Sequence, residues 1–282
     1  MADDPQPGLP TTRPAGFPFT RYDGRRGAQW LVEAWAMLAR ERMPWIGLVL
    51  AYYVALALIE SLPWIGAFLA PILKPVLSVG MLAAAWTQER GGRPQLRMLG
   101  RGFGANLWAL VPLGVVLIAG VAIAIAATAL VDGGKLLELL YSGAPVDADS
   151  AAAATSLRAT LSDPAVELAM LFGGLCALPT ILALWWAPAL VVFQDAGALA
   201  ALRASLRAAL ANWRPVLRYA LLVFLLGGVV PSFITTLVTL IAPAPLYQLL
   251  ASALLLPYVL IFVTVLHIAD YVSYRDVFHA GE

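Results

Sequence analysis

The chain has 282 residues, of which 61% are hydrophobic and only 12% are charged, and its mean hydropathy is +0.81. Soluble domains carry about a quarter of their residues as charged side chains, so this composition excludes a soluble globular protein and indicates an integral membrane protein. The net charge of +1 averages over the two sides of a membrane and gives no reason to expect a nucleic-acid partner.

The two ends of the chain are predicted to lie outside the membrane. The first eighteen residues contain five prolines and two aspartates but no continuous apolar stretch. This composition is typical of a disordered tail and lacks the apolar core of a cleavable signal peptide. We therefore expect a disordered, proline-rich tail over residues 1–26, a membrane domain over residues 27–274, and a short second tail over residues 275–282.

Six stretches are long and apolar enough to cross the hydrocarbon region as helices, which takes about 20 residues each. They are longer and more continuous than the alternating strands of a membrane barrel. The predicted fold class is therefore an all-α integral membrane protein with six transmembrane helices. We place these helices near residues 44–62, 65–87, 107–131, 164–193, 215–238 and 247–271.

Positive charges gather on one side of this arrangement. Short loops rich in arginine and lysine remain in the cytoplasm, so the pattern predicts that both termini are cytoplasmic. Only Lys74, Lys135 and Arg158 fall elsewhere. The fifteen arginines on the predicted cytoplasmic side are Arg13, Arg21, Arg25, Arg26, Arg40, Arg42, Arg90, Arg93, Arg97, Arg101, Arg203, Arg207, Arg214, Arg218 and Arg275.

The longest predicted periplasmic segment covers residues 132–162. It contains the amphipathic sequence KLLELL, a turn and an alanine-rich stretch, so we expect one or two short surface helices there. Asp163 followed by Pro164 is typical of a helix start, with an aspartate N-cap and proline at the first helical position. The fourth span should therefore begin at residue 164.

Two segments of the chain repeat each other. Leu96–Asn106 (LRMLGRGFGAN) and Leu202–Asn212 (LRASLRAALAN) align without gaps and are identical at five of eleven positions. In each segment a stripe of leucine or phenylalanine runs beside arginines four residues apart, as in a helix that lies in the membrane surface. A similar arrangement precedes the first span. The sequence therefore predicts three units, each consisting of an interfacial amphipathic helix and a hairpin of two spans.

The chain also resembles known proteins in two stretches, QWLVEAWAMLARERMPWIGL and LCALPTILALWWAPALVVFQDAGALAALRASLRAALANW. They resemble an uncharacterised family of proteobacterial six-span inner-membrane proteins. The APALV stretch and the helix after it are more distantly similar to the membrane domain of some glycerophosphodiester phosphodiesterases. The resemblance implies a membrane fold and a bacterial inner-membrane location. It implies no catalytic residues, since the phosphodiesterase domain has no counterpart here.

The sequence contains no zinc-protease motif, paired CxxC, phosphate-binding loop or nucleophile elbow, so no metal, cofactor or catalytic residue is expected. Ionisable residues inside spans are costly and mark candidate sites. Glu60 ends the first span and Lys74 lies within the second, which makes them a candidate intramembrane charge pair unless Lys74 extends outward to the interface. His267 and Asp270 are one helical turn apart, and the pattern favours an interfacial position over a proton relay.

The function predicted from these features is non-enzymatic. We expect an inner-membrane protein that interacts with lipids or a partner in envelope maintenance or complex assembly. Anionic lipids and a membrane-protein partner remain open alternatives. The arginines of the amphipathic segments are either lipid-headgroup ligands or topological signals only. The other function classes are a small transporter or channel and, third, a membrane-embedded lipid enzyme. The headgroup candidates are Arg97, Arg101, Arg203, Arg207, Arg214 and Arg218.

Overall fold

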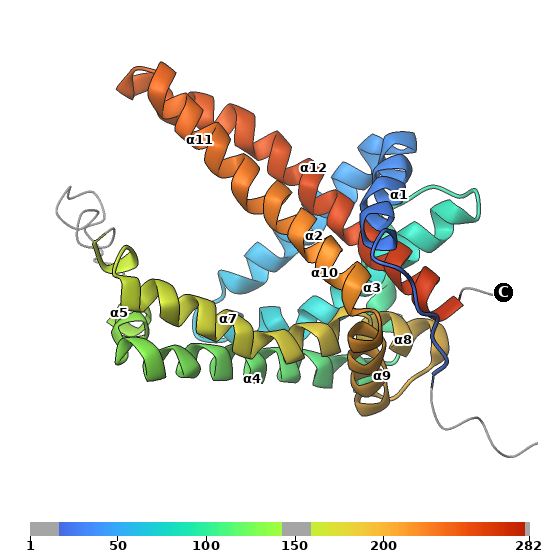
Figure 1. Cartoon of the computed structure of the whole chain (residues 1–282). Coiled ribbons are helices and arrows are strands. Elements are labelled where there is room, and N and C mark those ends of the chain that lie inside the picture. Colours follow the sequence, from blue (N-terminus) through green and yellow to red (C-terminus); the bar gives the residue numbers. More distant parts are fainter. Residues whose placement is uncertain (1–16, 143–158, 280–282) are drawn as a thin grey trace, which may run out of the picture.

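A computed structural model describes residues 17–142 and 159–279 (Figure 1). These residues form helices and contain no β-strand. Six helical segments are long and apolar enough to cross a membrane, which confirms the predicted fold class. The six segments are Arg42–Glu60, Gly66–Glu89, Leu107–Asp132, Pro164–Gln194, Trp213–Ile241 and Leu246–His279.

Three short amphipathic helices each precede two of these spans in the chain, while the threefold organisation itself stays a prediction. The first group is α1 (Arg26–Arg40), α2 (Arg42–Glu60) and α3 (Gly66–Glu89). The second is the 3-10 helix η1 (Leu96–Gly104), α4 (Leu107–Asp132), α5 (Lys135–Ser142), α7 (Pro164–Trp185) and α8 (Ala187–Gln194). The third is α9 (Ala198–Ala211), α10 (Trp213–Phe224), the π-helix η2 (Leu225–Val229), α11 (Val230–Ile241) and α12 (Ala244–His279).

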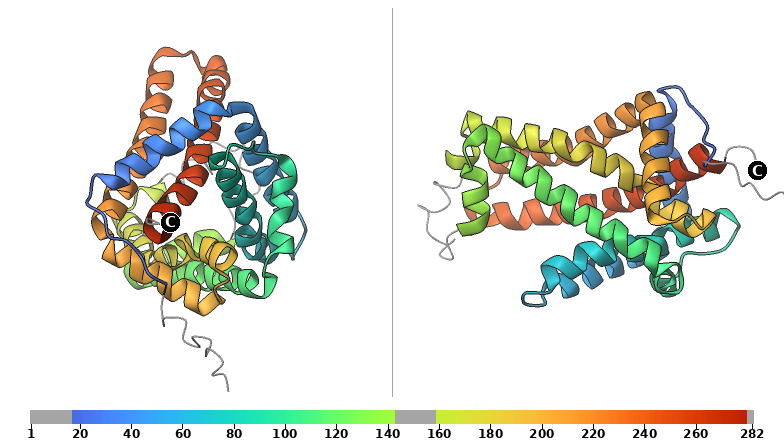
Figure 2. Two further views of the ribbon diagram at one scale, coloured as in Figure 1. Left: turned by 90° about the vertical axis from the view of Figure 1, so that its right-hand side faces the viewer. Right: turned by 90° about the horizontal axis from the view of Figure 1, so that it is seen from below.

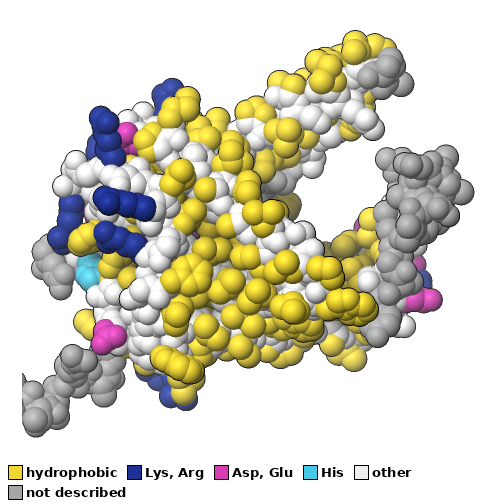
Figure 3. Space-filling view, turned by 180° about the vertical axis from the view of Figure 1, so that it is seen from behind, with side chains coloured by type: hydrophobic (Ala, Val, Ile, Leu, Met, Phe, Trp, Pro, Cys, Tyr) yellow, Lys and Arg dark blue, Asp and Glu magenta, His cyan; other side chains and the backbone are white. Residues whose placement is uncertain are grey.

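The spans converge at one end of the molecule and diverge toward the other. Helices α4 and α7 pack along each other as one arm, and α11 packs against α12 as a second arm that points away from the first (Figure 1). Helices α1 and α9 and the last turns of α12 lie together at the converging end (Figure 2). Lysine and arginine side chains gather there, and a hollow separates the two arms at the far end (Figure 3). We call the two ends the basic end and the open end.

An aromatic core holds the basic end together. Trp30 of α1 is fully buried and meets the rings of Trp185, Trp186 and Tyr219 edge-on, with centroids 6.3, 6.4 and 6.0 Å away. Edge-to-face contacts of this kind add to the free energy gained from burial alone. The far parts of the spans present their side chains outward, since Leu240 of α11 is 78% exposed. The buried aromatic side chains of α1, α7 and α10 therefore lie at the basic end.

The predicted fourth span is interrupted at Trp186, where α7 ends and α8 begins. In a continuous helix the Trp186 amide would donate to the carbonyl of Leu182. Here it donates to the hydroxyl of Ser205 in α9 at 3.1 Å, and that hydroxyl donates to the Leu182 carbonyl at 2.7 Å. A side chain inserted into the backbone ladder is a recognised cause of helix kinks. The neighbouring helix α9 thus satisfies the groups that the break exposes.

The fifth span contains a second irregularity, the π-helix η2. Tyr258 of α12 donates its hydroxyl to the Leu226 carbonyl at 2.5 Å. A Cβ atom at Gly227 would lie 2.7 Å from the ring of Phe262, so a larger residue there would require that ring to shift. Within a membrane a displaced backbone carbonyl needs such a protein partner, because lipid provides none.

Both ends of the folded domain extend further than predicted. Helix α12 continues past residue 271 to His279, and Tyr274 and Val277 are buried. Residues 17–25 cross the basic end, where the Thr20 amide donates to the Val277 carbonyl at 2.8 Å and the Tyr22 amide donates to the Asn212 side chain at 2.9 Å. Residues 17–25 and 275–279 are therefore packed, and not tails. The rest of the predicted tails, residues 1–16 and 280–282, lies outside the described residues.

The predicted start of the fourth span is confirmed, because the Asp163 side chain accepts the Ala165 amide at 2.9 Å and Pro164 opens α7. The same carboxylate pairs with Lys135 at 2.5 Å, and this hydrogen bond lowers the pKa of Asp163 and raises that of Lys135. Helix α5 covers the KLLELL sequence. Residues 143–158 of the predicted periplasmic segment lie outside the described residues.

Candidate functional site

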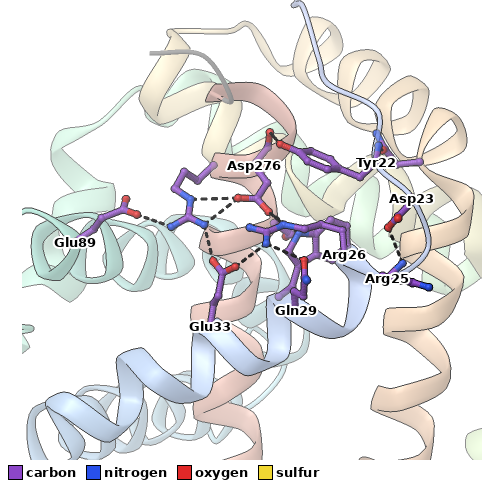
Figure 4. Close-up of polar contacts among 12 residues, drawn as sticks. Tyr22, Asp23, Arg25, Arg26, Gln29, Glu33, Glu89 and Asp276 are labelled. Carbon is purple, nitrogen blue, oxygen red and sulfur yellow. Dashed lines mark hydrogen bonds and ion pairs between the residues drawn. The ribbon is translucent and has the colours of Figure 1, made fainter.

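A network of ion pairs links α1, α3 and α12 at the basic end (Figure 4). The Arg275 guanidinium contacts Glu89 at 2.5 Å, Glu33 at 2.7 Å and Asp276 at 2.9 Å. Arg26 contacts Glu33 at 2.7 Å and also pairs with Asp276. The hydrogen bond that Arg26 donates to the Asp276 carboxylate is the main cause that raises the pKa of Arg26. Two arginines and three carboxylates thus form one connected network across three helices.

This network is structural, because its members already have partners. The Asp276 side chain is only 6% exposed and also accepts the Trp30 indole N–H at 3.0 Å. A buried carboxylate with several donors is compensated for the loss of water. Arg26 and Arg275 therefore fix α1 against α12, and they have little capacity left for a ligand. Sequence reasoning placed both arginines among the topological charges and missed the network.

The six arginines predicted to bind headgroups have a different environment. All six side chains are exposed, and within the described residues none of them forms an ion pair with a carboxylate. Arginine guanidiniums without an internal partner are free to bind phosphate. They come from three elements of the basic end: Arg97 and Arg101 from η1, Arg203 and Arg207 from α9, and Arg214 and Arg218 from α10.

Helix α9 turns its small side chains inward and its large apolar ones outward. Ala201 and Ala208 are fully buried as α9 packs against α7, while Leu199 and Leu210 are each 58% exposed. Small residues let two helices approach closely. The outward leucines lie on the same helix as Arg203 and Arg207, an arrangement typical of a helix at a membrane interface.

The 3-10 helix η1 also buries some of its side chains and exposes its large apolar ones. Met98 and Gly102 are buried, whereas Leu96 is 59% exposed and Phe103 is 50% exposed. A Cβ atom at Gly102 would lie 1.8 Å from the Val76 carbonyl, so glycine is required for η1 to lie directly on α3. Both repeated segments therefore present apolar and arginine side chains away from the protein.

A second group of polar side chains lies inside the spans, which we call the intramembrane cluster: Lys74, His267 and Asp270, with Tyr52, Tyr53 and Trp185 around them. The Trp185 indole donates to Asp270 at 3.1 Å, and the Tyr53 hydroxyl lies 3.3 Å from His267 Nε2. Lys74 is near enough to His267 and Asp270 to interact with both electrostatically.

The interfacial position that the sequence favoured for His267 and Asp270 stays a prediction. His267 lies eight residues before Arg275 in α12, which corresponds to about 12 Å along the helix at 1.5 Å per residue. Helix α12 continues to His279, so both residues lie within the helix and not at its end. The extended run of Tyr271, Tyr274 and Phe278, at helical spacing, was the sequence signal for this longer helix.

The predicted pair of Glu60 and Lys74 is not brought together. Both side chains are exposed, and no ion pair joins them in the part of the chain that the structure describes. Lys74 lies near α12 instead, while Glu60 is the last residue of α2. No group of three metal-ligating side chains is close enough to hold a metal ion in the described residues.

Comparisons with known proteins give one relative. No protein-family model matches the chain, and no solved structure is similar to it. A protein of Burkholderia thailandensis named as a probable inner membrane protein is 26% identical over 262 residues, which cover 92% of this chain and 93% of that protein. The likeness to the membrane domain of phosphodiesterases stays a prediction. The chain is a six-helix, all-α membrane protein, similar along nearly its whole length to a probable inner membrane protein.

Proposed function

We propose that this is a non-enzymatic protein of the bacterial inner membrane that binds anionic phospholipid headgroups at its basic end. In this role it contributes to envelope maintenance or to the assembly of another membrane complex. The name of its relative supports the location. The observation that carries the proposal is that Arg26 and Arg275 are held by carboxylates in the ion network, whereas the six arginines on η1, α9 and α10 are exposed and form no ion pair in the described residues.

The energetics suit a moderate preference for anionic lipids. A basic residue near an anionic leaflet contributes about 1 kcal/mol, so the four arginines of α9 and α10 together favour such lipids measurably. The arginine stems cover apolar surface while the guanidiniums reach phosphate. Exposed Leu199 and Leu210 add apolar contact with the acyl chains beside them.

The test replaces Arg203, Arg207, Arg214 and Arg218 by glutamine. Native mass spectrometry of protein released from nanodiscs should show fewer retained phosphatidylglycerol or cardiolipin molecules than for the unaltered protein. A matched variant with lysine at the same four positions keeps the charge and should retain most of the lipid. If the glutamine variant carries the same lipids as the unaltered protein, these arginines are orientation signals only.

A small transporter is the second candidate, because the intramembrane cluster puts ionisable groups inside the spans, where they often mark substrate pathways. A transporter must expose this cluster to both sides in turn. Tyr53→Cys in a Cys176→Ser background can be labelled with a membrane-impermeant maleimide from each side of the membrane. Labelling from both sides would favour transport over the lipid-binding function. Because the aromatic core and the ion network close the basic end, we expect labelling from the other side only.

A further inference from the structure

The intramembrane cluster lies where the two arms of the molecule meet. Trp185 at the end of α7 contacts Asp270 of α12 at 3.1 Å, and from this contact α7 and α12 diverge toward the open end (Figure 1). The surface beside the hollow between the arms is largely hydrophobic (Figure 3). His267 lies one turn from Asp270 toward the open end, and Lys74 approaches both from α3. The polar side chains of the intramembrane cluster thus lie at the closed end of an apolar hollow, and we call this end the apex.

The hydrogen-bonding groups of this apex are unevenly satisfied. Asp270 has the Trp185 indole and His267 has the Tyr53 hydroxyl. The Lys74 side chain is exposed, and no ion pair is formed by its ammonium among the described residues. The Tyr52 hydroxyl is buried and has no hydrogen-bond partner within residues 17–142 and 159–279, and the ring of Tyr52 lies 5.0 Å from that of His267.

The groups of the cluster that lack a partner among the described residues are therefore the Lys74 ammonium and the Tyr52 hydroxyl. The Asp270 carboxylate already accepts a hydrogen bond from Trp185. An ammonium inside a span is costly unless it finds an anionic partner or water. A carboxylate or phosphate would provide that partner, because lysine offers three donors and no acceptor. The apolar walls fit an acyl chain attached to such a group, and diverging spans leave the hollow open to the bilayer.

We propose that this apex binds the anionic headgroup, carboxylate or phosphate, of a membrane amphiphile, with Lys74 donating to the headgroup and the acyl chain lying in the hollow. This site is separate from the surface arginines of the proposed function. It recognises one anionic group inside the spans, whereas the arginines lie at the basic end. Loss of either site should leave the other intact.

The experiment uses the full chain in phosphatidylcholine nanodiscs and a palmitic acid with a photoreactive diazirine in its chain. Cross-linked peptides are identified by mass spectrometry. We expect saturable labelling of peptides from α3, α7 and α12, and an affinity about tenfold lower in Lys74→Met, as the loss of one charge-assisted hydrogen bond implies. Lys74→Arg, which keeps the charge, should restore labelling. Lys135→Met removes the chain's other lysine and should label normally.

Competition with unlabelled molecules distinguishes an anionic amphiphile from an uncharged one and from a soluble anion. Unlabelled palmitic acid should displace the probe, whereas hexadecanol and inorganic phosphate should not. Displacement by hexadecanol would show that charge is not recognised, and displacement by phosphate would show a site for a soluble anion; either overturns the proposal. Equal labelling of Lys74→Met and Lys135→Met, with equal melting temperatures, also overturns it. Labelling that persists in the four-arginine variant shows that the apex binds independently of the surface arginines.

Discussion

The arginines of this chain have two kinds of environment, which differ in whether a carboxylate lies within ion-pair distance. Arg26 and Arg275 lie among Glu33, Glu89 and Asp276, so their charges are used within the protein. Arg203 and Arg207 have alanine and leucine neighbours on α9 and no carboxylate within ion-pair distance among the described residues. Charge counts along the sequence treat all of these arginines alike, because the pairing residues are distant in the chain.

Arg275→Met should destabilise the protein by about 1–3 kcal/mol, because it leaves Glu33 and Glu89 without this cation and Asp276 with one cation fewer. The measurement is reversible unfolding in mixed detergent micelles. Arg93→Gln is the control, since Arg93 is 77% exposed and Glu41, at 3.1 Å, is its one ion-pair partner among the described residues. Exposed pairs contribute less than about 1 kcal/mol. Equal stability of the two variants would contradict the structural role of the network.

Ser205→Ala should weaken the junction of α7 and α8, because the Trp186 amide and the Leu182 carbonyl would lose their shared partner. Leaving buried polar groups unpaired costs about 1–3 kcal/mol. Ser232→Ala removes a hydroxyl that donates to Gly228 on the exposed side of α11, and it should change stability little. Thermal melting of both variants in detergent checks this. A larger loss for the Ser232 variant would rule out the bridging role of Ser205.

At the scale of the helices, hydropathy located all six spans, because lipid demands long apolar stretches whatever their packing. Local chemistry located the start of α7 at Pro164 as well. The break at Trp186 and the π-helix at Leu225–Val229 were not predicted. Both depend on partners in other helices, Ser205 and Tyr258, that satisfy the displaced backbone groups. The partner residues have no signature within the segment that bends, although Pro188 at the start of α8 is a local signal for the first break.

The sequence predicted the exposed arginines better than it predicted the intramembrane cluster. The exposed arginines of α9 followed from helical periodicity, which places Arg203 and Arg207 on one face. The neighbours of Lys74 could not be predicted in this way. Glu60 was the nearest opposite charge along the chain, whereas His267 comes from a helix that is distant in the sequence. Periodicity reports one helix at a time, whereas an intramembrane cluster depends on how helices are arranged around one another.

Close contact between α1 and α10 should depend on Gly27. A Cβ atom there would lie 2.1 Å from the Pro215 carbonyl, and backbone cannot move aside cheaply. Gly27→Ala should therefore lower the melting temperature and make α1 accessible to protease. Gly47→Ala in α2 has nothing within 4 Å and should be neutral or stabilising by up to about 1 kcal/mol through helix propensity. Matching melting curves for the two variants would show that α1 does not pack this closely.

The whole molecule is asymmetric, with a packed basic end and diverging spans at the open end (Figure 2). Exposed arginines at one end favour retention of that end in the cytoplasm. We therefore expect reporter fusions after residues 95, 210 and 282 to report cytoplasm, and a fusion near residue 150 to report periplasm. A periplasmic signal from the fusion at residue 210 would refute the predicted orientation.

The contact between the first helix and the last one sets the order of events during synthesis. Helix α1 ends at Arg40, yet its partners Arg275 and Asp276 are synthesised more than two hundred residues later. At about 5–20 residues per second, α1 waits on the order of 10–50 s before the network can close. Through that interval α1 can already contact α10 and the Trp185–Trp186 pair, but Arg26 and Glu33 lack their partners in α12. The ion network therefore closes only after the end of α12 has been made, and a chain that stops short of Arg275 lacks the ion pairs that join α1 to α12.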